Sequence, residues 1–418
     1  MRINRDKYLK ELIARKNNSL IKVITGIRRC GKSYLLNEIY YDYLISTGVS
    51  EDHIVSVSLD TLENKELLDA NNLNKYIKDK VKDNEIYYVF LDEIQEINNF
   101  VPLLNGLLQV KNLDIYVTGS NSKFLSSDIV TEFRGRGDQI HVSPLSFKEF
   151  YDAQNLTFEE AFDDYLTYGG MPFILKRKIP NLKISYLNNL FREIYLKDIK
   201  ERYNIRFDSE LEELLNIISS GIGSLTSPYK LERTFRSLKN VSLSTNTIDS
   251  YLKIFEESFL VRKADRYDIK GKKYINAPRK YYFSDMGLRN ARLNFRQFEE
   301  SHMMENIIYN ELIIRGYSID IGIVEINEKN DNDNYVRKQL EIDFVANIAN
   351  DKIYIQSAYM IPNKEKYAQE IRPFLKLEDS FKKILIVKDN IKPRKDEYGI
   401  IMISLRDFLL NEHILKSV

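Results

Sequence analysis

The chain has very little cysteine and histidine. Its 418 residues include one cysteine, Cys30, and four histidines. A single cysteine excludes an internal disulfide framework and is typical of a reducing cytoplasm, the compartment that we expect. So few cysteines and histidines also leave little material for a zinc site.

The chain also lacks long apolar runs and an excess of charge of either sign. No stretch of about 18 apolar residues occurs, so we expect no transmembrane helix and no membrane partner. Residues 1–18 are charged and lack the apolar core of a secretion signal. The net charge is +1, so any surface that binds nucleic acid must be local. The length suits two to four domains, and motifs must mark their boundaries because no repeat or low-complexity linker does so.

Residues 26–33 carry a phosphate-binding pattern. An apolar, β-branched run, IKVIT, precedes the sequence GIRRCGKS, and a helical pattern follows it. In this context the glycines let backbone N–H groups point at a phosphate, and the helix N-terminus adds partial positive charge. We expect Lys32 to reach the β- and γ-phosphates and the Ser33 hydroxyl to hold Mg²⁺. The predicted nucleotide-binding residues are Gly26, Arg28, Arg29, Cys30, Gly31, Lys32, Ser33 and Tyr34.

Within this loop some roles stay open. Arg28 and Arg29 either touch nucleotide phosphate or face solvent, and Cys30 occupies a variable position of the pattern. A Gly-rich turn without a ligand is the alternative for the whole segment, and the strand before it and the helix after it argue against that alternative.

A second element of the same chemistry lies at residues 87–93, YYVFLDE. A strand this apolar is typical of the centre of a parallel sheet. Asp92 at its end is expected to complete the Mg²⁺ shell, and Glu93 to polarise the attacking water as general base. A helix N-cap followed by an acid is the alternative. The Asp-Glu order favours an ATPase, and no Asn-Lys-x-Asp motif for reading guanine occurs.

Two further segments are candidates for contacts with the γ-phosphate. The run LDIYVTGSN places Asn121, or else Ser120, after a third strand, where a polar side chain would lie between phosphate and water; a simple turn is the alternative. Arg134 and Arg136 lie on a Gly-flanked turn. They could act as an arginine finger, in the same chain or toward a second copy in a homo-oligomer, or form a solvated basic loop.

At this point the sequence resembles a known family, the prokaryotic AAA-type ATPases with a C-terminal domain of unknown function. The motifs are TGIRRCGKS, VFLDEIQ, VTGSNS, FRGR with SPLSFKEF, YLTYGGMP at 165–172, and KYYFSDMGLRNA at 280–291, continued by MENIIYNELIIRGY, EIDFVA and IYIQ. The resemblance spans essentially the whole chain. It implies an ATP-binding, Mg²⁺-dependent ATPase in which Lys32, Ser33, Asp92 and Glu93 keep their roles. It implies no substrate. Tyr34 stands where a smaller residue is common.

Residues 151–290 are expected to contain a helical lid and a winged helix. Gly169 and Gly170 break the helical pattern of 151–207, as a hinge or as a helix cap. Residues 208–290 show three helices and a two-stranded wing, the pattern of a winged helix-turn-helix. DNA binding and protein docking are both open for such a module. The residues that would contact DNA are Thr245, Asn246, Thr247 and Ser250 at the recognition helix, with Arg262, Lys263, Arg266, Lys270, Lys272 and Lys273 on the wing.

Residues 291–418 have the layout of restriction-endonuclease-like domains. A helix carries Glu305, and two paired strands carry Asp343 and Gln356. Such sites need two or three carboxylates for Mg²⁺ and a lysine beside the attacking hydroxide. Here Gln356 replaces a carboxylate and Ala358 stands at the lysine position. We expect a folded domain with an incomplete site, in which Lys352 and Lys364 are the candidates for an amine from elsewhere.

The predicted fold is therefore a multidomain α/β chain. Its parts are a P-loop ATPase core of the AAA type and the ASCE branch at 1–150, a lid at 151–207, a winged helix at 208–290 and an endonuclease-like domain at 291–418. ATP and Mg²⁺ are the expected cofactors. The expected function is ATP hydrolysis coupled to a DNA or protein partner. The alternatives are a signalling or defence scaffold that assembles with ATP, and an active metal-dependent nuclease.

Overall fold

The computed structural model describes residues 2–119, 133, 135–203, 205, 208–239, 243–329 and 333–418. The chain forms two compact units. The first comprises Met1–Leu145 with Glu257–Phe259, and the second comprises Ser146–Glu256 with Leu260–Val418. Within the described ranges, no helix is both long and apolar enough to cross a membrane.

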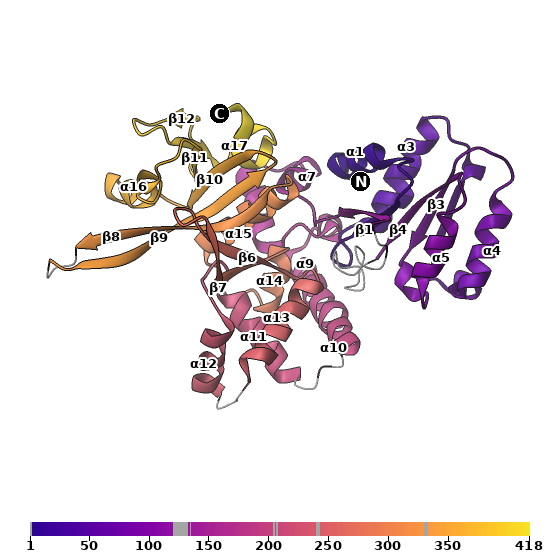
Figure 1. The fold of residues 1–418 in the computed structure, drawn as a ribbon, viewed down its shortest axis with the longest axis horizontal. Coiled ribbons are helices and arrows are strands. Elements are labelled where there is room, and N and C mark those ends of the chain that lie inside the picture. Colours follow the sequence, from indigo (N-terminus) through magenta and orange to yellow (C-terminus); the bar gives the residue numbers. More distant parts are fainter. Residues whose placement is uncertain are drawn as a thin grey trace. The chain divides into compact units, whose positions relative to one another are not determined.

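The first unit is built on a parallel five-stranded sheet in the order β2-β3-β4-β1-β5 (Figure 1). The strands are β1 Ile21–Thr25, β2 Ile54–Ser58, β3 Tyr87–Asp92, β4 Leu113–Thr118 and β5 Gly137–His141. Every residue of β1 and β3 is buried, because helices cover both faces of a parallel sheet. The predicted P-loop sheet is thus confirmed.

Helices pack on the two faces of this sheet with different side chains. Val23, Val89 and Val117 face a core that includes Leu73 and Leu104 from the helices of one face. On the other face, Tyr40 packs against Phe90 and Tyr116. The helical segments of this unit are α1 Asp6–Arg15, α2 Lys32–Tyr34, η1 Leu35–Tyr40, α3 Tyr41–Ser46, η2 Glu51–His53, η3 Leu62–Leu68, α4 Ala70–Lys80, η4 Ile94–Glu96 and α5 Phe100–Leu107.

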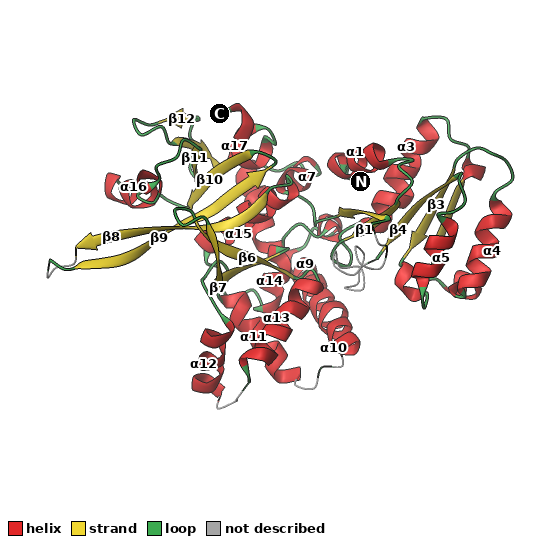
Figure 2. Cartoon of the chain, in the orientation of Figure 1, coloured by secondary structure: helices red, strands yellow, loops and turns green. Residues whose placement is uncertain are grey.

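The second unit begins with helices (Figure 2). Capping boxes at Ser146 and Thr157 start the first two of them, because each hydroxyl accepts the N–H of a glutamate three residues on, whose carboxylate accepts in return. The helical segments are α7 Phe147–Asp152, α8 Phe158–Tyr168, η6 Pro172–Lys176, α9 Pro180–Asn189, η7 Leu190–Leu196, α10 Lys197–Tyr203, α11 Asp208–Ser220, α12 Pro228–Lys239 and α13 Thr245–Glu257.

An eight-stranded mixed sheet forms the rest of the second unit, in the order β12-β13-β11-β10-β9-β8-β6-β7. Its strands are β6 Val261–Asp268, β7 Lys273–Phe283, β8 Ser318–Lys329, β9 Tyr335–Ile348, β10 Asp351–Ala358, β11 Lys382–Val387, β12 Arg394–Lys395 and β13 Ile401–Ser404. The accompanying helical segments are α14 Met286–Arg292, α15 Glu300–Ile314, α16 Lys364–Ile371, η8 Phe374–Lys376, α17 Leu405–Leu410 and α18 Ile414–Ser417.

The expected wing is the β6–β7 hairpin. The two strands pair antiparallel, and β6 also pairs parallel with β8, so the hairpin forms one edge of the eight-stranded sheet. One consequence corrects the sequence analysis. Arg266 is only 5% exposed and donates to Gln339 Oε1 at 2.8 Å, so it is not available to a phosphate. The winged-helix interpretation itself stays a prediction.

Two family motifs of the second unit pack directly on each other. Gly169 caps α8 with φ +72, and a Cβ there would lie 2.3 Å from Asp285 Oδ1. Asp285 accepts the N–H groups of Gly170 at 2.7 Å and Leu288 at 3.0 Å. Asn290 donates to the carbonyl oxygens of residues 166 and 167. Of the two interpretations of the glycine pair, the helix cap is the one observed.

Candidate nucleotide-binding site

The loop after β1 curls tightly, and its glycines make this possible. Gly26 has φ +144, and a Cβ there would lie 2.1 Å from the carbonyl oxygen of Val142. Gly31 adopts the left-handed conformation immediately before α2. Any side chain at Gly26 would clash with backbone, so the loop requires glycine at this position.

Lys32 lies inside this loop. Its side chain is buried, and Nζ donates to the carbonyl oxygens of Gly26 at 3.1 Å and Ile27 at 3.4 Å. The ammonium group is therefore held against the backbone of the loop by neutral acceptors. Such bonds can be exchanged for stronger ones to phosphate oxygens, because a charge-assisted hydrogen bond is about twice as strong as a neutral one.

The two predicted Mg²⁺ ligands meet at the end of β3. Asp92 is 6% exposed and accepts hydrogen bonds from the hydroxyl groups of Thr118 and Ser33. Burial raises the pKa of the Asp92 carboxyl, and these two hydrogen bonds oppose the shift. A hydroxyl and a carboxylate are the oxygen ligands that Mg²⁺ prefers, so the residues present fit this ion.

Glu93 follows in the left-handed conformation, with φ +55. Its backbone N–H donates to Thr118 Oγ1 at 3.0 Å, and its carboxylate accepts a hydrogen bond from the Gln95 amide. A non-glycine residue in this conformation costs about 1 kcal/mol or more, and such strain clusters at functional sites. Thr118 thus joins both acids, since it donates to Asp92 and accepts from Glu93.

Thr118 and Gln95 are residues that sequence reasoning missed. Thr118 is the last residue of β4, which lies between β1 and β3 in the sheet. The signal is its position at the end of the predicted third strand, just before Ser120 and Asn121. Gln95 could have been noticed two residues after Glu93.

The other predicted residues of this site have different positions. Asn121, its alternative Ser120, and Arg134 lie outside the described residues. Arg136 is exposed and donates to Asn105 Oδ1 at 3.0 Å. Arg28 and Arg29 are exposed at the loop, and Tyr34 is 36% exposed.

The side chain of Cys30 is buried, unlike those of Arg28 and Arg29. Its thiol is fully buried and donates to the carbonyl oxygen of Val142 at 3.2 Å. Burial raises the pKa of this thiol. The backbone N–H of Cys30 donates to the Ile27 carbonyl oxygen at 3.2 Å, so both donors of this residue have acceptors within the protein.

The predicted remnant of a nuclease cleft also forms a cluster, in the second unit. Asp343 on β9 donates its N–H to Gln356 Oε1 at 3.3 Å, and its carboxylate accepts from Ser357 N and Oγ at 2.8 Å each. Glu305 on α15 accepts from the Tyr282 hydroxyl at 2.6 Å. Burial, together with the neighbouring Glu305, raises the pKa of Asp343 to about 7.

The amine of this cluster comes from β7. Lys280 is 3% exposed, and its Nζ lies 2.9 Å from Glu305 Oε1 and 2.7 Å from Glu341 Oε1. Burial lowers the pKa of Lys280, but the surrounding carboxylates outweigh burial and raise it. Lys352, one of the two amines expected here, lies instead over the rings of Tyr267 and Phe381. Lys280 was missed, although it opens a motif of the family resemblance.

This cluster differs from a metal site. Among the residues that the structure describes, no group of three Asp, Glu, His or Cys side chains could hold a metal ion. Burial raises the pKa of Glu305, but attraction to Lys280 together with hydrogen bonds from Lys280, His302 and Tyr282 outweighs burial and lowers it, so Glu305 stays ionised beside the ammonium. Lys280 itself supplies the positive charge that a metal ion would otherwise bring to these carboxylates.

Comparisons with known proteins agree with the sequence motifs. The model of an AAA domain matches residues 18–151, and that of a domain of unknown function matches residues 159–299. An uncharacterized protein of Haemophilus influenzae is 34% identical over 414 residues, or 98% of each chain. The chain belongs to the prokaryotic AAA-type family that carries this C-terminal domain. An uncharacterized protein of Methanocaldococcus jannaschii is 30% identical over 438 residues, which cover 100% of this chain and 89% of that protein.

Solved structures resemble the AAA-type chain more distantly. The ORC1 protein of Aeropyrum pernix in complex with DNA is 10% identical, with a TM-score of 0.30, and covers 70% of this chain and 92% of its own. AMPPCP-bound DnaA from Aquifex aeolicus is 15% identical, with a TM-score of 0.31. The match covers 60% of this chain and 86% of the DnaA chain. These scores are too low to relate sites in those proteins to residues of this one.

Proposed function

We propose that the protein hydrolyses ATP with Mg²⁺ and couples its nucleotide state to a DNA or protein partner through the second unit. The observation that supports hydrolysis is that Thr118 hydrogen-bonds to both Asp92 and Glu93, while Ser33 hydrogen-bonds to Asp92, beside the loop that holds Lys32.

Each residue then has a task. Lys32 would leave its two backbone acceptors and bind the β- and γ-phosphates, while loop N–H groups and the N-terminus of α2 hold the phosphate chain. Ser33 and Asp92 would hold Mg²⁺, which neutralises charge that develops on the phosphate oxygens. Glu93 would accept a hydrogen bond from the attacking water and orient it, with Gln95 fixing its carboxylate.

Release of phosphate by the purified full chain tests this proposal. We expect ATP hydrolysis that needs Mg²⁺ and stops when the ion is chelated. Absence of turnover over a range of protein concentrations, with ATP and Mg²⁺ in excess, would contradict it. A range is needed because an arginine finger supplied by a second copy would make specific activity rise with concentration.

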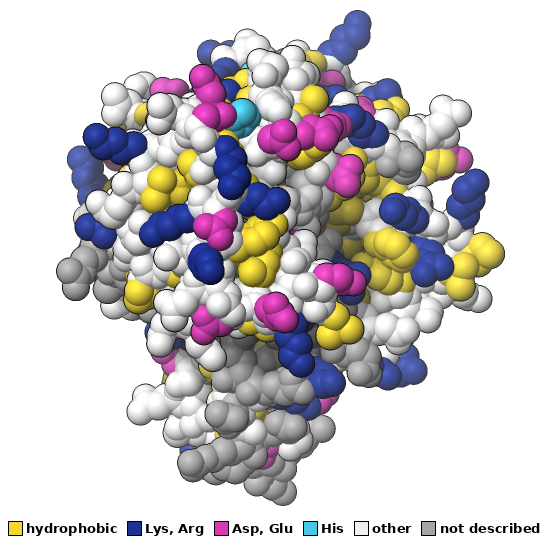
Figure 3. All heavy atoms as spheres, turned by 90° about the vertical axis from the view of Figure 1, so that its right-hand side faces the viewer, with side chains coloured by type: hydrophobic (Ala, Val, Ile, Leu, Met, Phe, Trp, Pro, Cys, Tyr) yellow, Lys and Arg dark blue, Asp and Glu magenta, His cyan; other side chains and the backbone are white. Residues whose placement is uncertain are grey.

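A nucleic-acid partner is supported by a groove of about 1060 Å³ at the amino ends of β10, β11 and β13. Its lining has six cations and one acid, Asp351, with exposed rings at Phe381 and Tyr398. Positive charge that follows a backbone, with rings on which bases stack, suits single strands. The cations are Lys352, Lys382, Lys383, Arg394, Lys395 and Lys416. By contrast, the face in Figure 3 intersperses acidic and basic side chains.

Fluorescence anisotropy with a labelled single strand and with a labelled duplex tests whether the protein binds nucleic acid. We expect affinity for one of them to fall steeply as salt rises, because bound cations release counterions. The double variant Lys395→Ala/Lys416→Ala should weaken binding, whereas Lys78→Ala/Lys80→Ala on α4 removes equal charge elsewhere and should not. Equal losses in both variants, or no binding at low salt, would favour a protein partner.

A further inference from the structure

A polar cavity of about 690 Å³ lies within the second unit, remote in sequence from the P-loop. Segments α9, η7 and α10 contribute one part of its lining, and α11 with the end of α14 and the residues after it contribute the rest. Among the residues that the structure describes, four cations and one acid, Glu212, line it. The cations are Arg192, Lys197, Lys200 and Arg292.

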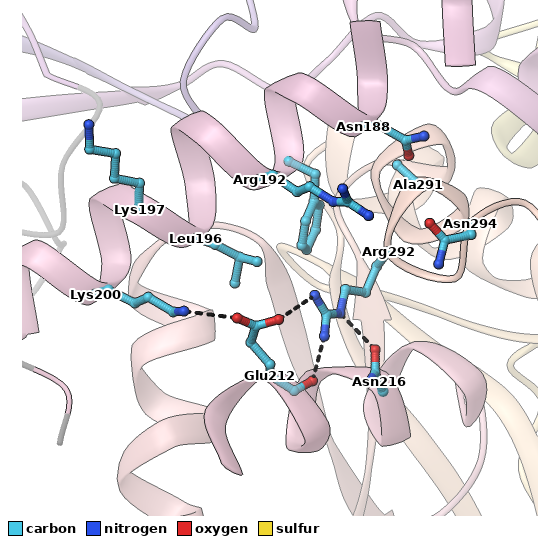
Figure 4. Close-up of a pocket in the computed structure, with 11 residues that line it drawn as sticks. Asn188, Arg192, Leu196, Lys197, Lys200, Glu212, Asn216, Ala291, Arg292 and Asn294 are labelled. Carbon is cyan, nitrogen blue, oxygen red and sulfur yellow. Dashed lines mark hydrogen bonds and ion pairs between the residues drawn. The ribbon is translucent and has the colours of Figure 1, made fainter. Parts of the chain in front are cut away.

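Glu212 organises one side of this cavity (Figure 4). Its Oε1 lies 2.8 Å from Lys200 Nζ and its Oε2 lies 3.2 Å from Arg292 Nη1. Burial raises the pKa of this carboxyl, but the two cations outweigh burial and lower it, so Glu212 is ionised at neutral pH. One carboxylate therefore contacts two cations of the lining.

Arg292 is fixed more tightly than a surface arginine. Its side chain is 11% exposed, Nε donates to Asn216 Oδ1 at 2.7 Å and Nη2 donates to the Glu212 carbonyl oxygen at 2.9 Å. With the bond to the Glu212 carboxylate, three of the five guanidinium donors are used. A planar guanidinium held in one orientation loses little entropy when its remaining donors bind a ligand.

Arg192 faces the same space but is not neutralised. Its side chain is exposed, and it makes no ion pair with any residue in the described part of the chain. Figure 4 shows its guanidinium extending toward the same space as that of Arg292, with the carboxamides of Asn188 and Asn294 beside it. Arg192 also lies in the π-helical segment Leu190–Leu196, and π-helical turns are rare and frequent at functional sites.

The side chains of the lining suit a phosphate-containing anion. Guanidinium, ammonium and amide groups are donors to oxyanions, and two arginines suit the paired oxygens of a phosphoryl group. The aromatic ring in the lining, Phe191, is 1% exposed, so it offers no face on which a base could stack. Recognition would therefore be of phosphate and not of base.

We propose that this cavity is a second phosphate-binding site, separate from the P-loop, in which Arg192 and Arg292 bind the phosphoryl oxygens of an anionic ligand. A free polyphosphate and the backbone of a nucleic acid present the same group. The proposal does not depend on ATP hydrolysis.

The test uses the full chain in a Lys32→Ala background, because an intact P-loop would itself bind phosphate. Titration calorimetry with pyrophosphate and anisotropy with a short labelled single strand measure the two sources. We expect one of them to bind, and Arg192→Ala to weaken that binding by about tenfold or more, since it removes charge-assisted hydrogen bonds to the phosphoryl oxygens.

The matched control is Lys178→Ala, an exposed cation of the same unit that does not line the cavity. It should change affinity by less than twofold, and thermal melts should show that both variants stay folded. Binding by pyrophosphate that the oligonucleotide does not displace assigns the site to free polyphosphate, and binding by the oligonucleotide alone assigns it to a backbone. Absence of binding by both, or equal losses in Arg192→Ala and Lys178→Ala, would overturn the proposal.

Discussion

The two units each hold a buried lysine near at least one buried carboxylate, and the two clusters are organised in opposite ways. Lys32 donates to backbone carbonyl oxygens, and Asp92 accepts from hydroxyl groups. Lys280 instead contacts Glu305 and Glu341 directly. In the first cluster the charged groups have neutral hydrogen-bond partners, and a bound ligand can replace those partners. In the second, one ammonium is shared by two carboxylates of the protein itself.

The difference shows what a buried charge implies. Moving a charge out of water costs several kcal/mol unless partners replace the solvent. Lys280 has those partners within the protein, so its cluster is complete without a ligand. At the first site, neutral acceptors replace only part of the lost solvation, and a phosphate or a metal ion would add to what they supply. Variants of the two clusters should therefore change different properties.

The largest effect is expected from Glu93→Gln. Loss of a general base typically costs about 10²- to 10⁴-fold in turnover, and the amide retains the shape of the side chain. Nucleotide affinity should hardly change, since Glu93 acts on water. Single-turnover phosphate release and nucleotide binding by fluorescence measure the two quantities. Turnover within threefold of the parent protein would remove Glu93 from this role.

Lys280→Met should produce the next largest effect, on stability. The change leaves Glu305 buried without its cation and also removes the cation from the half-buried Glu341. Breaking a buried ion pair by removing one partner costs about 3–5 kcal/mol. The free energy of unfolding from denaturant titration measures it.

Two variants sharpen this prediction. Lys148→Met removes an exposed pair with Asp152 and should cost less than about 1 kcal/mol. Adding Glu305→Gln to Lys280→Met should recover part of the loss, because it removes one unpaired charge. Nucleotide affinity of Lys280→Met, measured where it is folded, should equal that of the parent protein; a selective loss of affinity would break the comparison.

Lys32→Ala should lower nucleotide affinity and leave stability nearly unchanged, which is the reverse of the result expected for Lys280→Met. It removes charge-assisted bonds to phosphate, each worth about 1.5–3 kcal/mol, so nucleotide affinity should fall about 10-fold or more. The free energy of unfolding should change little, because Lys32 contacts only neutral acceptors. Equal nucleotide affinity in the variant and the parent would refute the assigned role.

A smaller effect concerns pH. The Asp343 carboxyl has a pKa near 7 in the folded protein and about 3.9 when unfolded. The folded state thus binds this proton more tightly, so the contribution to stability is full below about pH 4 and is lost as pH rises to 7.

Asp343→Asn should therefore flatten the fall in stability between pH 4 and 7, by up to about 1.4 kcal/mol per pH unit. The exposed Asp389→Asn is the matched control and should keep the slope of the parent protein. An unchanged slope in Asp343→Asn would show that its carboxyl titrates normally.

The last prediction is an absence of activity. The protein should not cut DNA with Mg²⁺ or Mn²⁺, with or without ATP, because the Lys280 ammonium already lies against Glu305 and Glu341, where a metal would need free carboxylate oxygens. Gln356 adds only a neutral amide. Incubation of plasmid DNA with the protein tests this. Metal-dependent nicking that Asp343→Ala abolishes and Lys32→Ala preserves would show that the second cluster is a working site with Lys280 as its amine.

Contiguous motifs could be interpreted from sequence because their chemistry is local. In residues 26–33 the glycines, lysine and serine are neighbours along the chain, and the loop shape follows from their backbone preferences. The same holds for Asp92 and Glu93 after an apolar strand. The contribution of Thr118 depends on β4 lying between β1 and β3, which no local pattern states.

By itself, then, the sequence determined the P-loop, the acids that follow β3 and the alternation of strands and helices, since each depends on residues within one turn or strand. Only the tertiary structure decided which charges are neutralised. Lys280, Glu305 and Glu341 come from β7, α15 and β9, and Arg192, Glu212 and Arg292 come from η7, α11 and α14. The energy of a charge depends on its burial and on its partners, and both arise only when distant segments pack together.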